Sequence, residues 1–103
     1  MFRLRLFRSN PPGNLAGSHR HVLTCMVDGP SAAPSLLLSL REQVEKSQHA
    51  AVSRLIAGDI VYVLDEFFML YPDGIWRHLS VPSPLTAGLY NKAVRAERES
   101  VGA

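Results

Sequence analysis

This chain has a single cysteine, no long apolar run and no recognisable secretion signal. The single cysteine, Cys25, excludes an internal disulfide framework. No apolar run approaches the roughly 20 residues that a membrane-spanning helix needs, and no apolar signal segment follows the N-terminal arginines. We therefore expect a cytoplasmic protein, with Cys25 as a small buried hydrophobe in a reducing compartment.

Recognisable catalytic and metal-binding motifs are missing as well. Gly13 and Gly17 lack the strand, helix and lysine of a phosphate-binding loop, and no elbow motif frames a serine. His19 and His21 would share one face of a strand, but two imidazoles without a cysteine pair do not make a zinc site. We therefore expect no enzymatic activity, no metal and no cofactor.

The composition is that of one small globular domain. The chain has 103 residues, of which 47% are apolar and 19% charged, which suits a single modest core and argues against disorder. We expect one domain over 1–103. It would consist of a basic strand and loop at 1–19, an α+β core at 20–98 and a tail at 99–103.

Positive charge is concentrated at the N-terminus. The first 20 residues contain four arginines and no acid, whereas the other 83 contain seven cations and nine acids. This arm could bind an anionic partner such as nucleic acid, or its arginines could keep an edge strand soluble. Both interpretations stay open for the residues concerned, which are Arg3, Arg5, Arg8 and Arg20.

Hydrophobic periodicity and turn residues predict a β-β-α-β-β-β-α order. The expected elements are strands at 2–6 and 21–27, a helix at about 34–57, strands at 60–64, 67–71 and 75–81, and a second helix from Ser83-Pro84. A loop is expected over 9–19, a short turn at Asp65-Glu66, and Gly58 is expected to end the first helix. The predicted fold class is α+β, with an antiparallel sheet of three to five strands packed against two helices.

The strongest local signal is a β-hairpin. Pro72-Asp73-Gly74 separates two apolar runs, and each of its residues favours a turn for its own conformational reason. A three-residue loop predicts cross-strand pairs, namely Tyr71–Ile75, Leu70–Trp76, Met69–Arg77 and Phe68–His78. Both faces of this hairpin are apolar, while helices on one side cover only one of them. The second face would belong to the core or to an interface.

The candidate binding residues are therefore those of the hairpin: Phe68, Leu70, Tyr71, Trp76, Arg77 and His78. We expect a non-enzymatic interaction module or inhibitor that docks on a larger protein or ribonucleoprotein, with self-association through the uncovered face. Small domains of this kind are common among phage and mobile-element inhibitors, including anti-CRISPR proteins. The alternative is an accessory nucleic-acid-binding protein that uses the basic arm. A third hypothesis is a small enzyme with a substrate pocket near Asp65 and His78, but no catalytic motif supports it.

Overall fold

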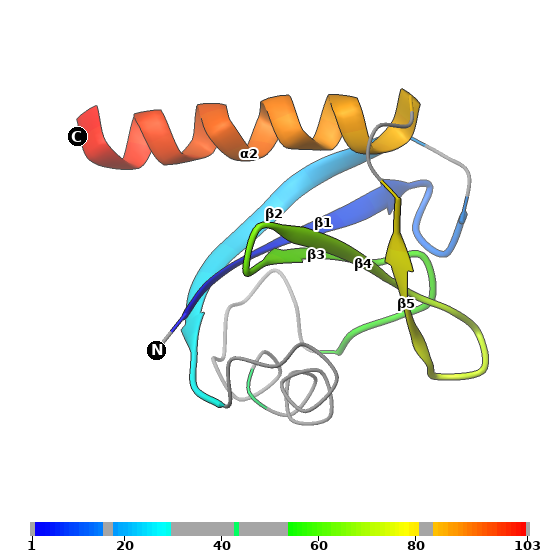
Figure 1. Ribbon diagram of the computed structural model, residues 1–103. Helices are drawn as coiled ribbons and strands as arrows, with labels where there is room; N and C mark the ends of the chain where they lie inside the picture. Colours follow the sequence, from blue (N-terminus) through cyan, green and yellow to red (C-terminus); the bar gives the residue numbers. More distant parts are fainter. Residues whose placement is uncertain (1, 16–17, 30–42, 44–53, 81–83, 103) are drawn as a thin grey trace.

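The computed structural model describes residues 2–15, 18–29, 43, 54–80 and 84–102. Its elements are β1 (Phe2–Asn10), β2 (Ser18–Val27), β3 (Ile60–Val63), β4 (Glu66–Leu70), β5 (Trp76–Leu79) and α2 (Pro84–Gly102). The strands form one antiparallel sheet in the order β2-β1-β3-β4-β5, and α2 lies along one face of it (Figure 1). The predicted α+β class and antiparallel sheet are confirmed.

The predicted helix at 34–57 is not confirmed. Most of it lies outside the described residues; of those that are described, Gln43 is helical, whereas the end at 54–57 is not. The Ile56 N–H donates to the Asp59 carboxylate over 3.0 Å, and the Ile56 carbonyl accepts the Asp59 N–H at 3.1 Å. Both bonds join residues that are three apart and close a turn. In an α-helix the same backbone groups of Ile56 would bond to residues four positions away. Gly58 therefore belongs to this turn, with φ at +92°, and does not follow a helix end.

Strand β1 lies inside the sheet, between β2 and β3. Its apolar residues Leu4, Leu6 and Phe7 are each fully buried. The interpretation of the N-terminal arginines as protection for an edge strand is therefore wrong for Arg3, Arg5 and Arg8, which lie on β1, whereas Arg20 lies on β2 at the edge of the sheet. Alternation in 2–6 correctly indicated a strand, but it could not reveal that both edges of that strand are paired, because pairing depends on distant residues.

The predicted loop at 9–19 is shorter than expected. Strand pairing continues until Asn10 meets Ser18, so the connection spans only 11–17. The Ser9 hydroxyl accepts the Asn14 N–H at 3.1 Å, which ties the loop back to the end of β1. The proline and glycine residues were correctly read as turn formers, but the polar residues around them belong to strands.

The β3–β4 connection is a two-residue turn. Leu64 and Asp65 have φ of +53° and +60°, and positive φ at both central positions is typical of the type I′ turn that suits a twisted hairpin. The turn lies one residue before the predicted Asp65-Glu66. The shift follows from the pairing of Val63 with Glu66, which places Glu66 at the start of β4.

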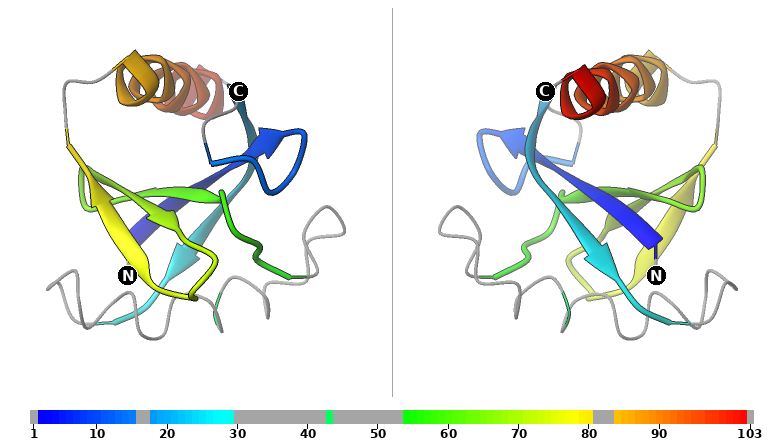
Figure 2. Two further views of the ribbon diagram at one scale, coloured as in Figure 1. Left: turned by 90° about the vertical axis from the view of Figure 1, so that its right-hand side faces the viewer. Right: turned by 90° about the vertical axis from the view of Figure 1, so that its left-hand side faces the viewer.

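Both faces of the sheet carry buried apolar clusters, and α2 lies over one of these faces (Figure 2). On the α2 side, Leu89 and Ala93 pack onto the sheet. The sheet residues beneath them are Phe7, Ile60, Phe67 and Met69. The opposite face holds a second buried cluster, formed by Leu4, Leu6, Leu23, Val27, Leu55, Val61, Val63, Phe68 and Leu70.

Candidate functional site at the β4–β5 hairpin

The β4–β5 hairpin has the predicted register. Leu70 pairs with Trp76, and the partners further along the two strands also match the prediction. The Tyr71 N–H donates to the Ile75 carbonyl over 3.1 Å and closes the three-residue loop. The Gly74 N–H donates to the Tyr71 carbonyl at 2.9 Å, with Gly74 at a φ of +81°. The turn chemistry read from the sequence therefore fixes this loop.

Side chains at the loop form a group that we call the hairpin tip, in which Asp73, Ile75 and Arg77 are exposed and Tyr71 and Trp76 are partly buried. The Arg77 guanidinium lies 4.5 Å from the centre of the Tyr71 ring and binds the Asp73 carboxylate at 3.0 Å. The Asp73 carboxylate also accepts the Ile75 N–H at 3.0 Å. These hydrogen bonds lower the pKa of Asp73, and the bond from Arg77 has the larger effect. The side chains of the tip thus contact one another, while backbone hydrogen bonds hold the path of the loop itself.

The predicted binding residues divide into buried and accessible ones. Phe68 and Leu70 belong to the core, with exposures of 5% and 2%. Trp76 is half-buried against the same core, whereas Arg77 and His78 are exposed. The His78 ring stacks edge-on against Phe68 at 5.4 Å and lies 3.4 Å from a carboxylate oxygen of Glu66.

Ile75 is a surface residue that the sequence reading treated only as a pairing partner. Its side chain is 55% exposed, one of the exposed large hydrophobic side chains in the described part of the chain. Its position beside the loop was a usable signal, because a strand residue next to a hairpin loop extends past the neighbouring elements that would bury it.

The outer edge of β5 adds backbone groups to this surface. Within the described ranges no strand lies beyond β5. Because Tyr71 and Ile75 form a hydrogen-bonded pair, the alternation of an antiparallel ladder makes Trp76 and His78 non-bonded positions relative to β4. Their N–H and C=O groups therefore point away from β4 and can bind an additional strand.

The arginines of the basic arm do not form one surface. Arg8 makes a two-bond ion pair with the fully buried Asp59, with both N···O distances at 2.9 Å. Arg5 is only 4% exposed. Arg3 and Arg20 are both exposed. Arg20 lies beside Arg8 in the sheet, and Arg8 is five residues along β1 from Arg3. At roughly 3.3 Å per residue, this separates Arg20 from Arg3 by about 17 Å along the strand.

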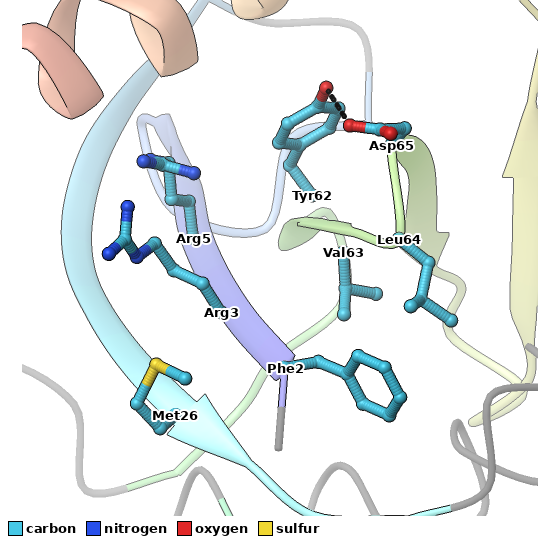
Figure 3. A pocket seen from close by; sticks show the side chains of 8 residues that line it. All are labelled: Phe2, Arg3, Arg5, Met26, Tyr62, Val63, Leu64 and Asp65. Atoms are coloured by element: carbon cyan, nitrogen blue, oxygen red, sulfur yellow. Dashed lines mark hydrogen bonds between the residues drawn. The ribbon is translucent and has the colours of Figure 1, made fainter.

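A pocket of about 380 Å³ lies beside the β3–β4 turn (Figure 3). The guanidinium groups of Arg3 and Arg5 lie along one wall, and Tyr62 and Asp65 lie on the other. The remaining lining residues are Phe2, Met26, Val63 and Leu64. Two cations against one carboxylate favour an anionic group in this space, although the burial of Arg5 leaves Arg3 as the more accessible cation.

Tyr62 supplies a proton donor in this pocket. Its hydroxyl donates to the Asp65 carboxylate over 3.2 Å. Burial, followed by the charge and hydrogen bond of Asp65, raises the pKa of Tyr62 to about 12. The phenol therefore keeps its proton at neutral pH and cannot serve as a general base there.

The histidines and the cysteine have local structural surroundings. His19 is buried, and its Nε2 lies 2.8 Å from the Gly58 carbonyl, which can only accept, so Nε2 carries the proton. The His21 ring lies 5.6 Å from that of Phe7. Burial raises the pKa of the half-buried Cys25 thiol. Among the described residues, no group of three His, Cys, Asp or Glu side chains could hold a metal ion.

No known protein family, curated protein or solved structure matches this chain. In the described part of the protein, no helix has the length and hydropathy to cross a membrane.

Proposed function

We propose that this protein is a non-enzymatic interaction module that docks the hairpin tip and the outer edge of β5 onto a larger protein. The observation that carries the proposal is the partly exposed hairpin tip beside an edge at which the described part of the chain places no further strand. Tyr71, Trp76 and Arg77 are of the residue types that dominate binding energy at protein interfaces. The occupant we propose is an extended segment of the partner, added to β5 as a further strand.

The geometry suits such a partner in two ways. The outward N–H and C=O groups of Trp76 and His78 supply main-chain hydrogen bonds, which bind without regard to sequence. The exposed Ile75 and the Tyr71–Arg77 stack supply side-chain contacts that select the partner. Because loop hydrogen bonds already hold the tip, little conformational entropy is lost on binding.

Docking of this kind would act by occlusion or by bridging. An inhibitor encoded by a phage or mobile element, such as an anti-CRISPR protein, is one example of a protein that acts in this way. No residue of the tip favours this example over other interaction proteins. The nucleic-acid alternative has weaker support, because Arg8 is paired inside the fold and Arg5 is buried.

Capture from the native host at increasing salt distinguishes the two functions. A contact made by apolar side chains and backbone groups should survive added salt, whereas phosphate binding by arginines should weaken steeply. We expect a salt-resistant protein partner that Ile75→Asp releases and Arg3→Ala retains. Salt-sensitive nucleic acid that Arg3→Ala releases would contradict the proposal.

A further inference from the structure

The outer edge of β2 is closed at both ends by side chains that take the place of a neighbouring strand. The Lys92 ammonium donates to the His19 carbonyl. At the other end, the Gln43 amide binds both the N–H and the C=O of Asp28, at 2.6 and 2.5 Å. No strand lies beyond β2 in the described part of the chain.

Between these ends, Thr24 and Met26 direct their backbone groups outward. The period of an antiparallel ladder is two residues, so Met26 and Thr24 share the outward orientation that Asp28 shows in its contact with Gln43. Counting from the other side of the sheet gives the same result. The Leu70 N–H donates to the Asp59 carbonyl over 2.9 Å, so the backbone groups of Asp59 point toward β4. Bonded and non-bonded positions alternate along each strand, and the pairings carry this pattern from β3 through β1 to β2. The backbone groups of Thr24 and Met26 again point outward.

This central part of the edge lacks the charged side chains and the proline that usually protect an edge strand. The residues from Val22 to Val27 include no charged residue and no proline, the devices that normally prevent edge-to-edge pairing. Thr24 is exposed, and Met26 is 51% exposed. The protected ends and the irregularity in the β1–β2 register before Leu23 limit any added strand to a short window.

We propose that this window pairs antiparallel with the same window of a second copy of the chain, about a two-fold axis at Cys25. Thr24 then faces the partner's Met26, and Met26 faces the partner's Thr24. In each pair, every outward N–H meets a C=O of the partner, so the partial charges are complementary. The side-chain pairs are neutral, and Asp28 lies opposite the partner's Val22, so no like charges meet.

The neighbouring registers, with the two-fold axis at Thr24 or at Met26, would form fewer backbone hydrogen bonds between the two copies. An axis at Thr24 would set Met26 against the irregular position Val22 of the partner. An axis at Met26 would require the Asp28 backbone groups that Gln43 already binds. The axis at Cys25 alone uses both outward residues of both copies.

This interface goes beyond the proposed docking function and does not depend on it. β2 and β5 are the opposite edges of the sheet, so a dimer through β2 leaves the hairpin tip of each copy accessible. The assembly would carry the tip twice, which raises the effective affinity for a partner that offers two sites.

Sedimentation of the full chain over a range of concentrations tests this interface. We expect a concentration-dependent dimer, and Met26→Lys should weaken it by at least about tenfold, since it places a cation at the window. Tyr90→Lys is the matched control, because Tyr90 is also exposed (49%) but lies on α2. Circular dichroism should show that both variants keep the fold.

Oxidative cross-linking tests the register separately. In a non-bonded antiparallel pair the Cα atoms lie about 4.5 Å apart, within the range of about 4.4–6.8 Å that a disulfide spans. Copper phenanthroline in air should therefore link the wild-type chain through Cys25 and leave Cys25→Ser unlinked. A monomer at all concentrations, a dimer that Met26→Lys leaves intact, or a dimer with unlinked Cys25 thiols would each overturn the proposal.

Discussion

Asp59 and Asp73 each bind an arginine, but in opposite surroundings. Asp59 is fully buried and also accepts the Ile56 N–H, while its partner Arg8 is mostly covered. In the pair of Asp73 with Arg77, both side chains are 47% exposed. An exposed ion pair is screened by water and contributes little, whereas breaking a buried pair leaves an uncompensated charge inside the protein.

The first prediction concerns this contrast. Asp59→Asn should destabilise the fold by about 3–5 kcal/mol, because it leaves the Arg8 charge partly buried without its counterion. Asp73→Asn is the control and should leave the urea midpoint nearly unchanged. Equal midpoints for the two variants would show that the Arg8–Asp59 pair does not stabilise the fold.

The second prediction concerns pH and Tyr62. The pKa of Tyr62 is about 12 in the folded protein, against a reference value of 10.0. Between these values the unfolded chain has released the phenolic proton while the folded chain still holds it, so stability falls as pH rises. Urea unfolding at pH 8 and pH 11 should show this loss, and Tyr62→Phe should show less of it. An identical loss in both proteins would contradict the role of Tyr62.

At the scale of elements, β1 supports the rest of the sheet. It pairs with β2 along nearly its whole length and with β3 at Arg5, Leu6 and Phe7. Without it, β2 would lose its ladder and β3 would lose one of its two neighbours. The N-terminal segment is therefore a structural element, in contrast to the separate basic arm that the charge pattern suggested.

The third prediction follows from this position. Deletion of residues 2–8 should abolish cooperative thermal unfolding, since it removes three fully buried apolar side chains and a central strand. Replacement of Arg3 and Arg20 by serine should leave cooperative melting intact, because both side chains are exposed. A truncated protein that melts cooperatively would contradict the structural role of β1.

Local chemistry in the sequence predicted much of the fold. The Pro72-Asp73-Gly74 loop and the register of its strands were predictable because a three-residue turn sets the pairing by itself. The position of β1 was not predictable, because strand order depends on contacts between distant segments. Residues 54–57 were misread because their apolar spacing resembled a helix, while the Asp59 side chain captures the Ile56 N–H.

The candidate site was predictable to a lesser degree. The sequence placed the hairpin correctly, but alternation along a strand cannot tell which of two apolar faces is covered. Phe68 and Leu70 were therefore proposed for binding, although a second cluster buries them. Ile75 was overlooked because its exposure results from the hairpin extending past the core, which requires the three-dimensional arrangement.

For the whole molecule, two opposite edges of one sheet carry different proposed contacts. The edge at β5 lies beside the hairpin tip and would take a strand of a larger protein, and the edge at β2 would take a second copy of the chain. The covered faces between them provide stability. A substitution at one edge should therefore leave binding at the other unchanged, apart from the loss of bivalent attachment.

Backbone amide hydrogen exchange, measured on the free protein and on its complex with the partner captured from the native host, tests the docking surface most directly. We expect the outward amides of Trp76 and His78 to exchange more slowly in the complex, since they would join a new ladder. Exchange at the pocket residues Arg3 and Asp65 should be unchanged. Slower exchange at the pocket, with Trp76 and His78 unaffected, would contradict docking through β5.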